Sequence, residues 1–404
     1  MDLEGVFRRE WGPAVAALAR WCGDLTLAED AVQEACAEAV RTWPGTGVPD
    51  RPGGWLLTVA RNRISDRLRR ESLRPGKESD AAMDDMRART DGSDPHPVRD
   101  DELRMMFTCA HPALDRASQL ALTLRLVSGL TVVEIARALL HSEAAVGQRL
   151  TRAKHKIRQA NIPLRVPPPE LLPERLPHVQ SCIYSVFTEG YWSTGGPSAI
   201  RDELCDEGGR LAAELCAMMP DDRESHALAA LIFLHDSRRS TRVDAAGALV
   251  PLDEQDRSRW ERSRITRGLA HLRAAAGSTG PYLPQAVIAA AHACAPSWER
   301  TDWVTIGAAY DALAAMTDSP VVAANRALAI GFRDGPEAGL RALDRVAHDP
   351  RLARSNLVAS VRADLLRRAG RTAEAAESYR EALELNGSDP GRDFLRRRIA
   401  ECER

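Results

Sequence analysis

The stretch GLTVVEIARALLHSEAAVGQRLTRAKHKIR (residues 129–158) predicts two short helices joined by a tight turn. Thr131 can cap the first helix, with Glu134 three residues later in the capping-box pattern, and Ser142 can cap the second. The faces predicted to be buried consist of apolar residues at helical spacing: Ile135, Ala136, Leu139, Leu140, Val146 and Leu150. The stretch is therefore predicted to be a helix-turn-helix.

The second helix of this pair begins with short polar side chains and continues with basic ones, which suits a recognition helix in a DNA major groove. Gln148 and Arg149 are candidates for base edges, and the later basic residues, Arg158 included, for phosphates. The candidate DNA-contacting residues are Ser142, Glu143, Ala145, Gln148, Arg149, Arg152, Lys154 and Lys156. An ordinary helical hairpin within a bundle carries the same caps and is the alternative interpretation.

Charge is distributed unevenly along the 404 residues. The chain has 55 Lys and Arg against 57 Asp and Glu, a formal net charge of −2. Residues 103–165 nevertheless contain ten basic and three acidic residues, and residues 61–74 contain six basic and two acidic ones. Two basic helical stretches in an otherwise mildly acidic chain favour contacts with nucleic-acid phosphates over a merely solvated face.

Several classes of protein lack support in the sequence. No apolar run reaches the roughly 18 residues of a membrane span, and the N-terminus has no signal-peptide pattern, so a cytoplasmic protein without membrane contact is predicted. The eight cysteines show no CxxC spacing and the ten histidines form no motif, so we expect no metal and no cofactor. No Walker loop, GxSxG or HExxH motif is present, and no enzymatic activity is expected.

Strand patterns are almost absent, and the chain is predicted to be all-α. Two helical domains, residues 1–74 and 100–161, flank an acidic flexible linker at 75–99. A Pro-rich spacer in polyproline geometry is predicted at 162–177, because helices do not usually continue through so many prolines. Residues 178–404 are helical again. The linker is interpreted either as a disordered tether or as an acidic mimic of nucleic acid.

Three segments together resemble a known family. Residues 129–158 resemble the region 4 helix-turn-helix of bacterial sigma factors, residues 27–43 resemble regions 2.1–2.2, and residues 51–70 resemble regions 2.3–2.4. Two such modules joined by a short linker resemble the extracytoplasmic-function (ECF) group of the sigma-70 family. The resemblance implies a region 2 helical bundle, a region 4 helix-turn-helix bundle, and a transcription initiation factor that directs core RNA polymerase to promoters with −10 and −35 elements.

The same resemblance implies where the partners bind. Region 2.2 docks on the clamp of bacterial RNA polymerase, with the flap as a further contact of the core enzyme, and the matching residues are Asp30, Gln33, Glu34 and Glu38. These lie on one helical face. Regions 2.3–2.4 open the −10 element, for which single-strand capture needs a cationic groove. The matching residues there are Arg61, Asn62, Arg63, Asp66, Arg67, Arg69 and Arg70.

Residues 178–404 resemble the long C-terminal extension of one sigma-factor subgroup, which is described as TPR-like. The segment 370–385 places Gly370, Ala375, Tyr379 and Ala382 at positions of the repeat, and 334–346 is a degenerate copy. We expect a regulator acting in cis, and a candidate site for a protein or small-molecule ligand. Two directions stay open: the extension covers the basic helices, or it adds polymerase contacts that are required for activity.

Two other interpretations also stay open. The whole protein could be a TPR-type interaction scaffold whose basic N-terminal half binds DNA without sigma activity. Within the extension, a charged segment next to a tryptophan is interpreted either as a ligand or partner site or as an ion-pair corner of the helical array; its residues are Asp253, Glu254, Asp256, Arg257, Arg259 and Trp260.

Overall fold

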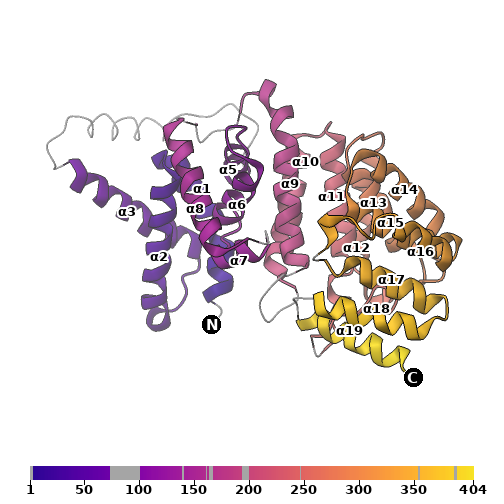
Figure 1. Ribbon diagram of the computed structural model, residues 1–404. Helices are drawn as coiled ribbons and strands as arrows, with labels where there is room; N and C mark the ends of the chain where they lie inside the picture. Colours follow the sequence, from indigo (N-terminus) through magenta and orange to yellow (C-terminus); the bar gives the residue numbers. More distant parts are fainter. Residues whose placement is uncertain are drawn as a thin grey trace. The chain divides into compact units, whose positions relative to one another are not determined.

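The computed structural model is helical almost throughout (Figure 1). It describes residues 3–72, 101–138, 141–160, 162, 167–192, 200–245, 247–353, 355–385 and 389–404. Within these ranges the one β-type pairing is an antiparallel bridge between Val243 and Leu249. The predicted linker at 75–99 lies outside the described residues. The chain divides into two compact units, residues 1–190 with 201–218, and residues 191–200 with 219–404.

The first unit begins with three helices, α1 (Leu3–Cys22), α2 (Leu25–Thr46) and α3 (Pro52–Ser72), which pack on one another. Helix α2 starts at Asp24, whose carboxylate accepts hydrogen bonds from the backbone N–H groups of Thr26 and Leu27 at 2.7 and 3.0 Å. Its buried stripe is built of small and β-branched residues, which lets the neighbouring helices approach closely: Ala28, Ala31, Val32, Ala35 and Ala39.

The predicted helix-turn-helix is confirmed. Helices α5 (Asp101–Cys109), α6 (Arg116–Leu126), α7 (Val132–Ala138) and α8 (Glu143–Gln159) form it and its support. Glu134 Oε2 accepts from the Thr131 backbone N–H at 2.8 Å, and the Thr131 hydroxyl accepts from the Glu134 N–H at 3.2 Å, which completes the capping box. Ser142 caps α8, and Ile135, Ala136, Val146 and Leu150 are buried. Leu139 and Leu140 lie outside the described residues.

The prediction of an extended spacer up to residue 177 is wrong. A 3-10 turn, η1 (Pro169–Leu171), leads into helix α9 (Leu172–Tyr191), which therefore begins inside the predicted spacer. Pro173 lies in the first turn, where a backbone N–H has no intrahelical partner to lose. Pro177 lies further inside, and the buried side chains of Leu176 and Val179 beside it show that packing holds this turn helical. Helix α10 (Asp202–Met218) completes the unit.

The second unit is a succession of helices in which neighbours in sequence are neighbours in space (Figure 1). Its helices are α11 (Arg223–Asp236), α12 (Arg262–Ala274), α13 (Tyr282–Cys294), α14 (Trp303–Met316), α15 (Pro320–Asp334), α16 (Pro336–Asp344), α17 (Leu357–Arg368), α18 (Thr372–Leu385) and α19 (Asp389–Cys402). Short 3-10 turns lie between them: η2 (Arg239–Thr241), η3 (Arg257–Arg259) and η4 (Pro350–Leu352).

Helices α15 and α16 meet through glycines. A Cβ added to Gly339 would lie 2.8 Å from the Cα of Gly331 and 2.9 Å from the carbonyl oxygen of Ala327. Both of these atoms belong to the backbone of α15, which cannot move aside as the end of a flexible side chain could. The pair of helices therefore tolerates only hydrogen at position 339.

We expect Gly339→Ala to destabilise the protein by about 1–3 kcal/mol, because the methyl group forces two helix backbones apart. The matched control is Gly45→Ala in α2, where an added Cβ meets nothing within 4 Å. Alanine should be neutral there or stabilise by up to about 1 kcal/mol through helix propensity. Thermal unfolding followed by circular dichroism measures both variants, and a Gly339→Ala protein as stable as the control would contradict the close approach.

Candidate functional site

The four residues predicted to dock on the polymerase lie on one side of α2. Asp30 and Glu34 have side chains that are 47% and 57% exposed, Gln33 is exposed, and Glu38 is half-buried. Their carboxylates face arginines of α3: Arg67 Nη1 lies 3.8 Å from Asp30 Oδ2, and Arg63 Nη2 lies 3.4 Å from Glu38 Oε2. The predicted polymerase-docking surface on α2 and the predicted −10 surface on α3 are therefore adjacent.

The residues predicted to contact the −10 element lie along the exposed side of α3. Arg61, Asn62, Arg63, Asp66, Arg67, Arg69 and Arg70 are all exposed, whereas Leu56 and Ile64 between them are buried. A hollow of about 480 Å³ lies along the line where α2 and α3 pack, and its lining residues are Leu27, Ala31, Glu34, Arg63, Ile64, Arg67 and Arg70. It is a groove with an acidic edge on α2 and a basic edge on α3.

The residues predicted to contact the −35 element divide into two groups on α8. Ser142, Glu143, Gln148, Arg152 and Lys156 are exposed, and Ala145 is half-buried. Arg149 is half-buried, and its Nη1 is enclosed without a hydrogen-bond partner among the described residues. The hydroxyl of Ser118 chiefly, and the charge of Arg149 to a smaller extent, hold the pKa of Asp115 below its usual value. Arg149 thus lies toward the body of the domain rather than on its open face.

Lys154 faces α2 instead of solvent. Its ammonium group is paired with the carboxylate of Glu29, which is buried and also accepts a hydrogen bond from Arg125 Nε at 2.7 Å. One turn further along α8, Arg158 Nη2 lies 3.2 Å from Asp24 Oδ2. Part of the basic face of α8 is therefore engaged with α2.

Sequence reasoning missed Glu29, although a signal for it exists. The residue lies among Ala28, Ala31 and Val32, on the stripe of α2 that turns inward. A carboxylate on such a stripe is stable as an anion only when cations and hydrogen bonds compensate its burial. The pattern could have predicted that basic residues elsewhere in the chain meet this position, but not which ones.

The helix-turn-helix domain also contacts α1, and this contact centres on Trp11. Its indole N–H donates to the carbonyl oxygen of Arg125 at 3.1 Å, and the guanidinium carbon of Arg125 lies 5.0 Å from the indole centroid. Gly129 adopts a φ of +66°, and a Cβ there would lie 3.0 Å from Trp11. Glycine at this position satisfies both the turn and the close approach of the ring.

Glu134 joins three parts of the first unit. Besides capping α7, its Oε1 lies 3.2 Å from Arg8 of α1 and 3.4 Å from Arg201, which precedes α10 and also pairs with Glu189 of α9 at 3.3 Å. Burial acts to raise the pKa of Glu134, but the hydrogen bonds from Thr131 and the charges of Arg8 and Arg201 outweigh it, so the pKa lies below its usual value. The extension is thereby linked to both N-terminal domains.

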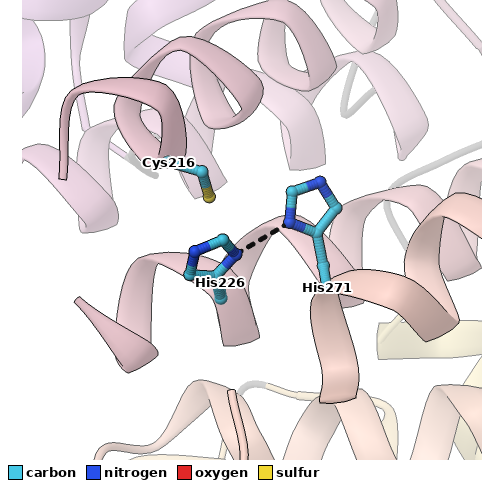
Figure 2. A group of neighbouring side chains, drawn as sticks. All are labelled: Cys216, His226 and His271. Atoms are coloured by element: carbon cyan, nitrogen blue, oxygen red, sulfur yellow. Dashed lines mark hydrogen bonds between the residues drawn. The ribbon is translucent and has the colours of Figure 1, made fainter. Parts of the chain in front are cut away.

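Two histidines that are 45 positions apart meet in the second unit. Figure 2 shows the imidazoles of His226 on α11 and His271 on α12 turned toward each other, and it also labels Cys216, a buried residue of α10. The two Nδ1 atoms lie 3.0 Å apart, so one donates and the other accepts. Burial chiefly, with the charges of His226 and Arg267, lowers the pKa of His271 to about 4. The sequence contains no motif that brings them together.

The charged segment before α12 forms an ion-pair corner. Glu254 Oε1 lies 3.0 Å and Asp253 Oδ2 lies 3.8 Å from Arg398 Nη2 of α19. The indole of Trp260 donates to Thr241 at 3.0 Å, and Asp256 caps η3 through Ser258. Arg257 is half-buried and Arg259 is exposed. Asp253, Glu254 and Trp260 therefore have structural partners within the second unit. Arg257 takes no part in these ion pairs and bonds to backbone carbonyl oxygens of α13 and the residue after it.

We expect Glu29→Gln to lower the stability of the protein by about 3 kcal/mol, because the amide leaves two cations without their shared counter-charge. The control is Glu34→Gln, an exposed carboxylate five residues later on the same helix, which should change stability by less than about 0.5 kcal/mol. Denaturant unfolding followed by circular dichroism measures both. Equal effects of the two substitutions would show that Glu29 is not the buried pivot between α2 and α8.

None of the helices described is long and apolar enough to cross a membrane. Three family profiles match the chain: Sigma-70 region 2 at residues 7–74, Sigma-70 region 4 at residues 104–157, and a family of unknown function (DUF6596) at residues 175–276. No solved structure matches the chain significantly.

Known proteins are similar to most of the chain or to part of it. An uncharacterized protein of Rhizobium meliloti is 43% identical over 378 residues, which cover 92% of this chain and 89% of that protein. The probable ECF RNA polymerase sigma factor SigI of Mycobacterium tuberculosis is 30% identical over 152 residues, which cover 37% of this chain and 52% of the relative. The two sigma domains imply binding to core RNA polymerase and promoter DNA. The chain is thus an ECF sigma factor of the sigma-70 family, a non-enzymatic transcription initiation factor with a DUF6596 extension.

Proposed function

We propose that this sigma factor uses α2 to dock on the polymerase clamp, α3 to hold the −10 element and α8 to contact the −35 element, and that its C-terminal extension regulates this activity in cis. The observation that carries the role of the extension is that α9 and α10 belong to the same compact unit as the two sigma domains. The extension is thus continuous with the parts that bind polymerase and DNA.

The surface of this chain that we propose docks on the clamp is formed by the carboxylates on one side of α2, with Gln33 among them. Its ion pairs with α3 are solvent-exposed and span 3.4–4.0 Å. Pairs of this kind contribute about 0–1 kcal/mol each, so basic residues of a partner can replace the arginines at little cost. Region 4 supplies the second polymerase contact, at the flap.

The proposed −10 surface is the basic edge of the groove between α2 and α3. It offers guanidinium groups in several successive turns of α3, as an unpaired, negatively charged strand requires. Arg61 additionally lies 5.7 Å from the ring of Trp21, a position that holds its guanidinium near α1. The buried Trp43 of α2 and Trp55 of α3, at 5.3 Å between ring centroids, help to hold the two helices together.

The proposed −35 surface is the exposed face of α8, and Gln148, Arg152 and Lys156 are its accessible members. Lys154 belongs to the predicted set but is paired with Glu29. A contact of Lys154 with DNA therefore requires α8 to separate from α2. This makes the strength of the contact between the two sigma domains a determinant of promoter binding.

The contacts of α9 favour an extension that is required for activity over one that merely covers the basic helices. Arg175 Nη1 donates to the carbonyl oxygen of Phe107 at 3.2 Å, and Cys182 Sγ lies 3.5 Å from the hydroxyl of Thr123. Both partners are buried residues of the region 4 domain. Removal of α9 would expose this interior to water, so α9 supports the fold of region 4.

We further propose that the distal part of the extension is a TPR-like array. Support comes from the α17–α18 pair, in which Gly370 has a φ of +76° at the turn. Ala375, Tyr379 and Ala382 of α18 are buried in one cluster with Ala363 and Leu365 of α17. Small residues at the crossing point and an aromatic residue one turn later match the packing that the repeat pattern predicts.

We expect Arg152→Ala to weaken promoter binding on all sequences and to reduce the salt dependence of log K by about one unit, because a phosphate contact is lost. Thr151→Ala, its exposed neighbour on α8, serves as the control and should leave the slope unchanged. Fluorescence anisotropy with promoter duplexes at several salt concentrations measures both. An unaltered slope for Arg152→Ala would place this residue outside the DNA contact.

Two truncations test the role of the extension. A chain that ends at Met218 keeps the whole first compact unit, α9 and α10 included. We expect it to support promoter-specific transcription with core polymerase. A chain that ends at Ala160 lacks α9 and α10, and we expect it to lose this activity because the interior of region 4 is exposed. Run-off transcription measures activity, and circular dichroism measures helicity.

The other outcomes would contradict this assignment. Higher activity of the chain that ends at Ala160 would support an extension that covers the DNA-binding helices. Unchanged activity of that chain would exclude both roles for the extension, and absence of promoter-specific product from the full chain would contradict the sigma activity itself.

A further inference from the structure

Five cationic or imidazole side chains converge in the second unit, and we call them the cationic cluster. They come from the end of α11, the segment that follows it, η3 and α13, and they are His235, Arg238, Arg242, Arg257 and His292. Neither the sigma domains nor the repeat packing of the extension uses them. The cluster lies entirely within the second unit.

One side of the cluster is organised by Tyr191. The guanidinium carbon of Arg242 lies 3.9 Å from the centroid of the tyrosine ring, and that of Arg238 lies 5.6 Å from the same centroid. Arg242 is buried and donates to the carbonyl oxygen of Tyr191. Arg238 Nη2 lies 3.3 Å from His235 Nδ1. Two positive charges are thus held against one ring.

The other side is organised by Arg257 and His292. Arg257 Nη1 donates to the carbonyl oxygens of His292 and Ala295 at 2.5 and 3.0 Å, and its guanidinium carbon lies 4.7 Å from the ring of Trp260. Its Nη2 is enclosed and has no hydrogen-bond partner in the part of the chain that the structure describes, and the same holds for Nδ1 of His292. Enclosed polar atoms of this kind are rare without a water or ligand partner.

The neighbouring carboxylates are engaged with other groups. Asp236 pairs with Arg239 at 2.6 Å and with Arg264, and Glu254 pairs with Arg398 at 3.0 Å. Among the described residues neither Arg238 nor Arg257 forms an ion pair within 4 Å. Glu299 is the carboxylate whose charge acts on Arg257, and it is exposed and hydrogen-bonded to Ser297.

The positive charges of the cluster contribute to the low pKa values of its two imidazoles. Burial chiefly, and then the charges of Arg238 and Arg242, lower the pKa of His235 well below its usual value. Burial and the charges of Arg238 and Arg257 lower the pKa of His292 to about 4. Both rings are therefore neutral near pH 7, when each offers one N–H group and one nitrogen lone pair.

We propose that the cationic cluster binds a phosphate group of a small molecule, with Arg238, Arg257 and His292 as its hydrogen-bond donors. Guanidinium groups match the oxygen geometry of phosphate, and charge-assisted bonds of this type are the strong ones. The guanidinium charges of Arg238 and Arg257 are compensated better by a phosphate dianion than by a single carboxylate. Arg242, which is buried and bonded to Tyr191, adds to the positive potential of the cluster. The site is independent of whether the extension regulates transcription.

The test is isothermal titration calorimetry of the full chain with inorganic phosphate, at constant ionic strength maintained with sodium chloride. We expect saturable binding, and an affinity lower by about tenfold or more in Arg238→Gln and in Arg257→Gln, because each loses a charge-assisted bond. Arg259→Gln is the matched control, since Arg259 is an exposed arginine two residues after Arg257. It should bind phosphate as the unmodified chain does.

Acetate in a parallel titration distinguishes the two kinds of anion and should bind at least about tenfold more weakly than phosphate, having half its charge. Thermal unfolding checks the fold of each variant. Arg238→Gln carries the test if Arg257→Gln fails to fold, because the side-chain bond of Arg238 is to His235, only three residues earlier in the chain. Absence of phosphate binding, equal loss in Arg259→Gln, or equal binding of acetate would each overturn the proposal.

Discussion

A buried carboxylate can persist in a protein only if cations reach it, and the first unit of this sigma factor depends on that condition at Glu29. The residue lies on the inward stripe of α2, and Arg125 and Lys154 approach it from the helix-turn-helix domain. The two sigma domains are thus held by one shared counter-charge. The position of α8 against α2, and with it the accessibility of the basic face of α8, follows from that requirement.

Local chemistry made much of this structure predictable. The capping box at Thr131, the cap at Ser142 and the buried stripe of the helix-turn-helix depend on residues within four positions of one another, and the structure confirms them. The exposure of the arginines on α3 follows from the same helical spacing. In each case the interacting groups are neighbours along the chain, so a pattern of residue types suffices.

Interactions between distant residues could not be read in the same way. Lys154 and Glu29 are 125 positions apart, and nothing near Lys154 distinguishes it from the neighbouring basic residues that remain exposed. The polyproline prediction failed at Leu172 because the packing of Leu176 and Val179 outweighs the local preference of two prolines. The pairing of His226 with His271 likewise depends on how α11 meets α12, which no motif records.

The groove between α2 and α3 has a thermodynamic consequence. Asp30 and Glu38 neutralise Arg67 and Arg63 in the free protein, so each carboxylate competes with any anionic strand for its arginine. A polymerase surface that takes up the carboxylates would remove this competition and raise the affinity of the arginines for DNA. Linkage makes such an effect reciprocal, because the promoter strand would then strengthen the hold of the polymerase by the same factor. Cooperative assembly of a ternary complex can in this way be encoded in a few exposed ion pairs of one helical hairpin.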